Sequence, residues 1–116
     1  MKKMNRKALE LQREVERIKK GLVELGDLRP GSLSRQYNVC GKPGCRCKAS
    51  PPEKHGPYYQ VSYTRKGRSG SMFVRREQVA RVRQQLKNYA KMRRLLDRWI
   101  EAGAELSNLR LAEQRG

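Results

Sequence analysis

"NVCGKPGCRCKASPPEKHGPYY", residues 38–59, holds all three cysteines and the one histidine of the chain. The basic segment around it is too short, and too poor in large apolar side chains, to form a stable core without a cross-link such as a disulfide or a bound metal ion. A disulfide is an unfavourable staple, because the cysteine count is odd and Cys45 and Cys47 lie too close in sequence for ordinary bridge geometry. A bound metal ion is the better candidate.

The spacing C-x4-C-x-C-x7-H predicts a structural Zn²⁺ ion held by Cys40, Cys45, Cys47 and His55. The insert "GKPG" lets the chain turn around the ion, and its backbone N–H groups can donate to thiolate sulfur. In small domains structural zinc supplies on the order of 10–16 kcal/mol of apparent folding free energy, more than a thin sheet contributes. In the alternative, the three cysteines bind the metal with a water or another chain's ligand, and His55 is a loop residue.

The middle of the chain is also strongly basic. The 116 residues carry a net charge of +17, and residues 29–76 contain eleven Lys/Arg against a single acidic residue, Glu53. Such a surface repels itself unless a polyanion lies against it, and nucleic acid is the abundant cytosolic polyanion. We therefore predict a nucleic-acid partner, with DNA preferred over RNA. The alternative is a charged surface that only confers solubility, or the tail of a larger assembly.

Phosphate contacts are expected from three groups of basic side chains, in the metal loop, at a hairpin tip and just before the last helix. These residues are Lys42, Arg46, Lys48, Arg65, Lys66, Arg68, Arg75 and Arg76. Tyr58 can stack on an exposed base, although packing in the core is the commoner role of a tyrosine on a short hairpin.

Both ends of the chain have helical periodicity. Apolar residues repeat in heptads and predict a helix from about residue 4 to 25; they are Met4, Ala8, Leu11, Val15, Ile18, Leu22 and Leu25. A second apolar face predicts a helix from about residue 77 to 112, with Ile100 and Leu109 widening it. We expect the two helices to pair as an antiparallel, coiled-coil-like hairpin. Because the second is longer, its surplus face is free to form a homodimer.

Between the helices, residues 33–39, 58–64 and 71–75 alternate apolar and polar side chains and predict about three short antiparallel strands. A loose, glycine-containing loop, "RKGRSG", joins the last two. The predicted fold class is thus α+β. It comprises an N-terminal amphipathic helix (1–28), a basic zinc-binding β-domain (29–76) and a long C-terminal helix (77–116), forming one structural domain overall.

Several classes of function are disfavoured. No apolar stretch approaches a membrane span, and the basic start lacks the apolar block of a secretory signal, so a cytoplasmic protein is expected. A catalytic zinc site needs a general base, and the only carboxylate in residues 29–76 is Glu53. Phosphate-cradling and Ser/His/Asp patterns are missing from the sequence, and we expect no enzymatic activity.

The run "RPGSL", "CGKPGCRC" and "HGPYY" resembles a small, mostly uncharacterised bacterial domain family that is often found near mobile genetic elements. The resemblance extends from about Leu28 to Arg98. It implies that the Cys/His set acts together as a zinc site and that residues 56–59 shape the following strand. Where many members have a Ser/Thr-Pro-Glu helix start, this chain has "SMFVRREQ".

Two functions follow from these patterns. The first is a zinc-stabilised nucleic-acid-binding protein, acting as an accessory subunit of a mobile-element or other nucleoprotein machine. The second is a helical adaptor that dimerises or docks on a protein partner such as a transposase, with zinc serving only to hold the β-domain together.

Overall fold

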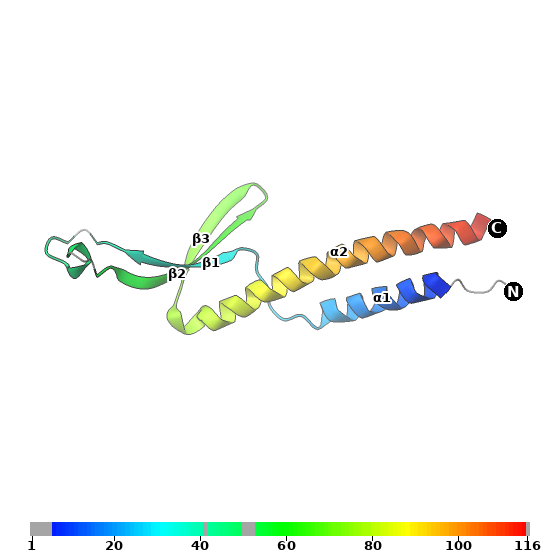
Figure 1. The fold of residues 1–116 in the computed structure, drawn as a ribbon, viewed down its shortest axis with the longest axis horizontal. Coiled ribbons are helices and arrows are strands. Elements are labelled where there is room, and N and C mark those ends of the chain that lie inside the picture. The colour runs from blue at the N-terminus through cyan, green and yellow to red at the C-terminus, as the bar shows by residue number, and fades with distance from the viewer. Residues whose placement is uncertain (1–5, 41, 50–52, 116) are drawn as a thin grey trace. The chain divides into compact units, whose positions relative to one another are not determined.

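The computed structural model describes residues 6–40, 42–49 and 53–115 (Figure 1). The chain divides into two compact units. Unit 1 comprises residues 1–27 and 88–116, and unit 2 comprises residues 28–87. The long helix α2 (Val79–Arg115) contributes its first turns to unit 2 and the remainder to unit 1.

In unit 1, α1 (Arg6–Val23) packs antiparallel against the C-terminal part of α2 (Figure 1). The direction follows from the contacts, because Gly21 faces Leu95 whereas Gln12 accepts a hydrogen bond from Arg110 at 3.1 Å. The core consists of Ala8, Leu11, Val15, Ala102 and Leu106, with Trp99 and Leu109 partly buried against it. Four of the predicted heptad positions, Ala8, Leu11, Val15 and Ile18, are buried. Leu22 and Leu25 are only half-buried, and Leu25 lies beyond the end of the helix at Val23. Met4 lies outside the described residues.

Ile100 is a correction to the predicted helix face. Its side chain is 69% exposed, whereas Ala102, which the pattern did not include, is 5% exposed. Trp99, Ala102 and Leu106 follow one another by three and four residues and so face α1 together. One residue further round the helix, Ile100 points about 100° away from that face. It does not widen the buried stripe.

Unit 2 contains the predicted three-stranded antiparallel sheet, in the order β1-β2-β3 (Figure 1). The strands are β1 (Ser32–Asn38), β2 (His55–Arg65) and β3 (Arg68–Val74). Together with the two helices, the longer of which is C-terminal, this sheet confirms the predicted α+β class.

The β2–β3 connection is tighter than the predicted loose loop. Arg65 pairs with Arg68, so only Lys66 and Gly67 lie in the turn. Their φ angles of 52° and 76° are both positive, as in the primed two-residue turns whose twist matches that of paired strands. The remainder of "RKGRSG" is strand.

The two faces of the sheet differ in character. Alternate residues of β2 and β3 point to one face, where Val61 and Val74 are buried with Val79 and Val82 from the start of α2. Val61 is 1% exposed. Leu33, Tyr59 and Leu86 are partly buried against this cluster. The opposite face carries hydroxyl side chains and is open.

None of the helices among the described residues combines the length and the apolar character needed to cross a membrane.

Candidate metal centre

Strand pairing brings the two ends of the metal loop together. Asn38, the last residue of β1, pairs with His55, the first residue of β2. Cys40 follows two residues after Asn38, so it lies at the same edge of the sheet as the imidazole. The intervening loop carries the other two cysteines, with Cys47 in a short 3₁₀ turn, η1 (Arg46–Lys48).

Gly56 allows the strands to approach closely beside this loop. Its φ of 139° lies in a region that L side chains rarely adopt. A Cβ atom at this position would lie 2.7 Å from the carbonyl oxygen of Gln36 and 3.0 Å from the ring of Tyr37. Only glycine fits here without moving β1.

The four predicted ligands form one cluster. The Sγ atoms of Cys40, Cys45 and Cys47 and a ring nitrogen of His55 all lie within 4.8 Å of one another. The Sγ atoms of Cys40 and Cys47 are 3.5 Å apart, and Sγ of Cys45 lies 3.1 Å from Nε2 of His55. His55 thus lies in the same cluster as the three cysteines, as expected if it is the fourth ligand and not only a loop residue.

These separations fit tetrahedral coordination. With Zn–S bonds of about 2.3 Å, two sulfurs of a tetrahedron lie roughly 3.8 Å apart. The contacts of 3.5 Å and 3.1 Å are slightly shorter than this, and the full set of donor atoms extends to 4.8 Å, so the cluster has the size of a tetrahedral site. Because Nε2 of His55 faces the sulfurs, it is the ring nitrogen positioned to coordinate.

Backbone N–H groups stabilise the sulfurs. The amide of Cys40 donates to Sγ of Cys47 at 3.3 Å. A backbone hydrogen bond from Lys42 lowers the pKa of the Cys40 thiol, and hydrogen bonds with the other two cysteines lower it further. Burial raises the pKa of the Cys47 thiol, which is 1% exposed. A cation among the sulfurs would offset this penalty on the Cys47 thiolate. Gly41, part of the predicted turn, lies outside the described residues.

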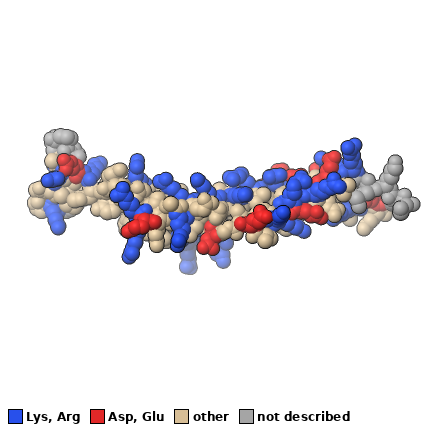
Figure 2. Space-filling view, turned by 90° about the horizontal axis from the view of Figure 1, so that it is seen from below, with Lys and Arg blue, Asp and Glu red and all other residues tan. Residues whose placement is uncertain are grey.

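The predicted basic residues are all exposed, but they do not form one cluster. Lys42, Arg46 and Lys48 belong to the metal loop. Arg65, Lys66 and Arg68 surround the hairpin turn at the other end of β2, and Arg75 and Arg76 follow β3. Figure 2 shows basic side chains over much of the visible face, with fewer acidic ones among them.

Two aromatic side chains differ from expectation. Tyr58 is 42% exposed and lies outside the buried cluster of unit 2, so the expected core packing is not observed. Phe73 had no predicted role, yet it is 72% exposed. Its position opposite Gln60 puts it on the polar face of the sheet. The sequence does contain an indication of this exposed position. In "SGSMF" (69–73), Phe73 alternates with two serines and so shares their face of the strand.

Fold and site together define a small α+β protein with a Cys₃His cluster that can hold a metal ion. Residues 8–84 match the family model DUF6788, described as a domain of unknown function. The chain belongs to this family, in agreement with the predicted membership of an uncharacterised family. No curated protein and no solved structure matches the chain.

Proposed function

We propose that this protein is a zinc-stabilised nucleic-acid-binding protein without enzymatic activity. Cys40, Cys45, Cys47 and His55 hold the ion. The choice of zinc rests on the donor set, since three thiolates and one imidazole form a closed tetrahedral site of the structural type. The role of the ion is to order the metal loop beside the sheet.

The charge of unit 2 is the observation that carries the nucleic-acid proposal. Residues 28–87 contain fourteen Lys/Arg and two acidic residues, Glu53 and Glu77, a net charge of +12. Among the described residues of this unit the one ion pair is Arg46–Glu53, at 3.9 Å and largely exposed. Nearly all of the positive charge is thus uncompensated within the unit, and a polyphosphate backbone is the complementary partner.

Charge reversal tests this proposal. Arg65, Lys66 and Arg68 are changed together to Glu, and binding to a labelled DNA of mixed sequence is followed by fluorescence anisotropy. The matched control reverses three exposed residues of α2 in unit 1, Lys91, Arg93 and Arg94, and so has the same net charge. Selective loss of binding in the hairpin variant supports the proposal. Equal affinities of the two variants would contradict a contact at the hairpin.

A second candidate is the adaptor. A shallow, mostly apolar groove of about 340 Å³ runs along α2 in unit 1, lined by Leu96, Trp99, Ile100, Gly103, Ala104 and Ser107. A second copy of the chain, or a subunit of a mobile-element nucleoprotein machine, would cover this groove. Ile100→Glu puts a charge into it without touching the core. Loss of a complex in sedimentation, with DNA binding intact, would favour the adaptor.

A further inference from the structure

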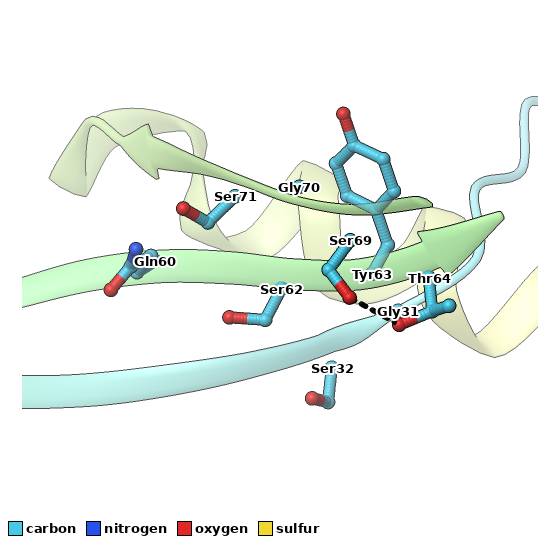
Figure 3. Close-up of a pocket in the computed structure, with 9 residues that line it drawn as sticks. All are labelled: Gly31, Ser32, Gln60, Ser62, Tyr63, Thr64, Ser69, Gly70 and Ser71. Atoms are coloured by element: carbon cyan, nitrogen blue, oxygen red, sulfur yellow. Dashed lines mark hydrogen bonds between the residues drawn. The ribbon is translucent and has the colours of Figure 1, made fainter. Parts of the chain in front are cut away.

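The open face of the sheet in unit 2 is lined by hydroxyl groups. Ser32, Ser62 and Ser71 lie opposite one another on the three strands and form a row across the sheet. Beside this row, Thr64 and Ser69 are hydrogen-bonded to each other at 3.1 Å. These side chains line a shallow depression of about 600 Å³. Figure 3 shows them on the three strands. The surface is flat because no residue in the row is larger than serine, and it is polar because each residue carries a hydroxyl group.

Tyr63, which also borders the depression, does not obstruct it. Its ring covers Gly70 on the neighbouring strand, where a Cβ atom would lie 2.7 Å from Cζ of the ring. In Figure 3 the ring points away from the hydroxyl groups of Ser62 and Ser71. A ligand can therefore approach the hydroxyl row directly.

Two exposed aromatic rings lie on this same face. Gln60 pairs with Phe73, and Tyr58 is two residues before Gln60 on β2, so both rings share the phase of the hydroxyl row. They are diagonal neighbours on adjacent strands, a relationship that brings side chains within about 7–8 Å. Neither ring is needed by the core, which Val61 and Val74 provide on the other face. Single exposed apolar residues are common, but a neighbouring pair beside a hydroxyl row is a potential stacking surface.

Positive charge borders the open face at both ends of the strands. Arg65, Lys66 and Arg68 form the hairpin end next to Thr64 and Ser69. Arg75 follows Phe73 by two residues, at the end near Tyr58. None of the strand residues in phase with the hydroxyl row is acidic. Arg75 shares the phase of Phe73, whereas Arg65 and Arg68 share the phase of Val61 and border the open face only at the hairpin end. The face thus combines aromatic rings and hydroxyl donors, with cations at its border.

We infer that this face binds single-stranded nucleic acid, with bases stacked on Tyr58 and Phe73 and phosphates contacting the serine hydroxyls and the cations that border the face. The inference rests on the proposed function and specifies the form of nucleic acid. Stacking needs the flat face of an unpaired base, and in a duplex that face is covered by neighbouring base pairs. A purely electrostatic duplex site would have no use for two exposed rings.

The test compares oligonucleotides of about 12 nucleotides, within the roughly 4–16 nucleotides that single-strand sites cover. Fluorescein-labelled DNA and RNA single strands of one mixed sequence, and the matching duplexes, are titrated with the zinc-loaded full chain. Single strands of at least one type are expected to bind more tightly than the duplexes. Tyr58→Leu and Phe73→Leu should each weaken single-strand binding roughly 5- to 150-fold, the range found for removal of a stacking ring.

Matched variants separate stacking from folding. Tyr58→Phe keeps the ring and should keep the affinity, whereas Tyr58→Leu keeps only the apolar volume. Zinc content and the melting curve should be the same in all variants. In the unmodified protein, photocrosslinking of a 5-iodouracil-substituted single strand followed by mass spectrometry should label Tyr58 or Phe73, and this readout needs no variant.

The outcomes distinguish the two proposals. Tighter binding to duplex, with unchanged affinity in both leucine variants and crosslinks elsewhere, would overturn the single-strand inference but leave nucleic-acid binding intact. Failure to bind any of the four oligonucleotides would overturn both.

Discussion

Asn38 and His55 are paired across β1 and β2, and this pair closes the loop that carries the cysteines. The backbone pairing thus holds Cys40 and His55 at the same end of the sheet. Sheet and metal centre are therefore expected to stabilise each other.

Metal removal should affect unit 2 more than unit 1. Three thiolates without a cation repel one another, and the sheet has only a small apolar face. Purified protein should contain one zinc per chain by mass spectrometry under native conditions. A chelator should lower the temperature at which β-structure melts, as followed by circular dichroism. An unchanged melting curve in a fully demetallated sample would refute a structural role.

The fourth ligand can be tested by exchanging one donor for another. His55→Ala removes a direct metal ligand and should weaken metal binding by more than the 10–100-fold that is lost when a hydrogen-bond partner of a ligand is removed. His55→Cys offers a sulfur instead and should retain a four-coordinate ion. With Co²⁺ as a probe, the absorption spectrum should show an added thiolate in the cysteine variant. Identical Co²⁺ spectra in the unmodified protein and His55→Ala would show that the imidazole is not a ligand.

Gly56→Ala should destabilise the sheet beside the metal loop. The new Cβ would meet the carbonyl oxygen of Gln36 at 2.7 Å, and the φ of 139° is itself unfavourable for alanine. Together these effects should lower the free energy of unfolding by about 1–3 kcal/mol in denaturant titrations. Gly67→Asn is the control, because nothing lies within 4 Å of that position and asparagine tolerates its φ of 76°. If both variants were equally stable, the close approach at Gly56 would be of no consequence.

Salt should weaken nucleic-acid binding steeply. If six of the exposed basic side chains contact phosphates, log K should fall against log salt with a slope of about −5 on duplex DNA and about −4 on single strands. Removing one contacting residue, for example by Arg68→Ala, should reduce the slope by about one. Titrations at several NaCl concentrations provide the measurement, and a flat response would be incompatible with electrostatic binding.

Substitutions at a buried and at an exposed apolar residue of unit 1 should differ in their effect on stability. Leu11 is 4% exposed in the core, so Leu11→Ala should cost about 2–5 kcal/mol. Ile100 is 69% exposed, and Ile100→Ala should change stability by less than about 0.5 kcal/mol. Denaturant titrations at two protein concentrations provide the check. A large, concentration-dependent effect of Ile100→Ala would reveal association through the groove on α2.

Local patterns predicted much of the fold and of the candidate site. The heptads of α1, the alternation in β2 and the clustering of Cys and His are each set by nearby residues, so they can be read without tertiary information. The sequence predicts a loose loop where the chain forms a tight turn at Lys66–Gly67, because "RKGRSG" does not show which of its residues pair. Register is a tertiary property, fixed here by the burial of Val61 and Val74 on one face.

The open face of the sheet was not predictable in the same way. Alternating serines indicate a solvent-facing strand, and Phe73 shares their phase, but the pattern does not indicate a ligand. Ile100 was misplaced for a related reason. A stripe wide enough to include both Trp99 and Ile100 fits the helical period, and only the position of α1 decides which of them is covered.

Unit 1 is assembled from the two ends of the chain, whereas unit 2 is one uninterrupted stretch. During synthesis, α1 leaves the ribosome long before Ala102 and Leu106 exist to cover it. Unit 2, by contrast, needs no residue after 87. The helical pair can therefore close only after the whole of unit 2 has been synthesised.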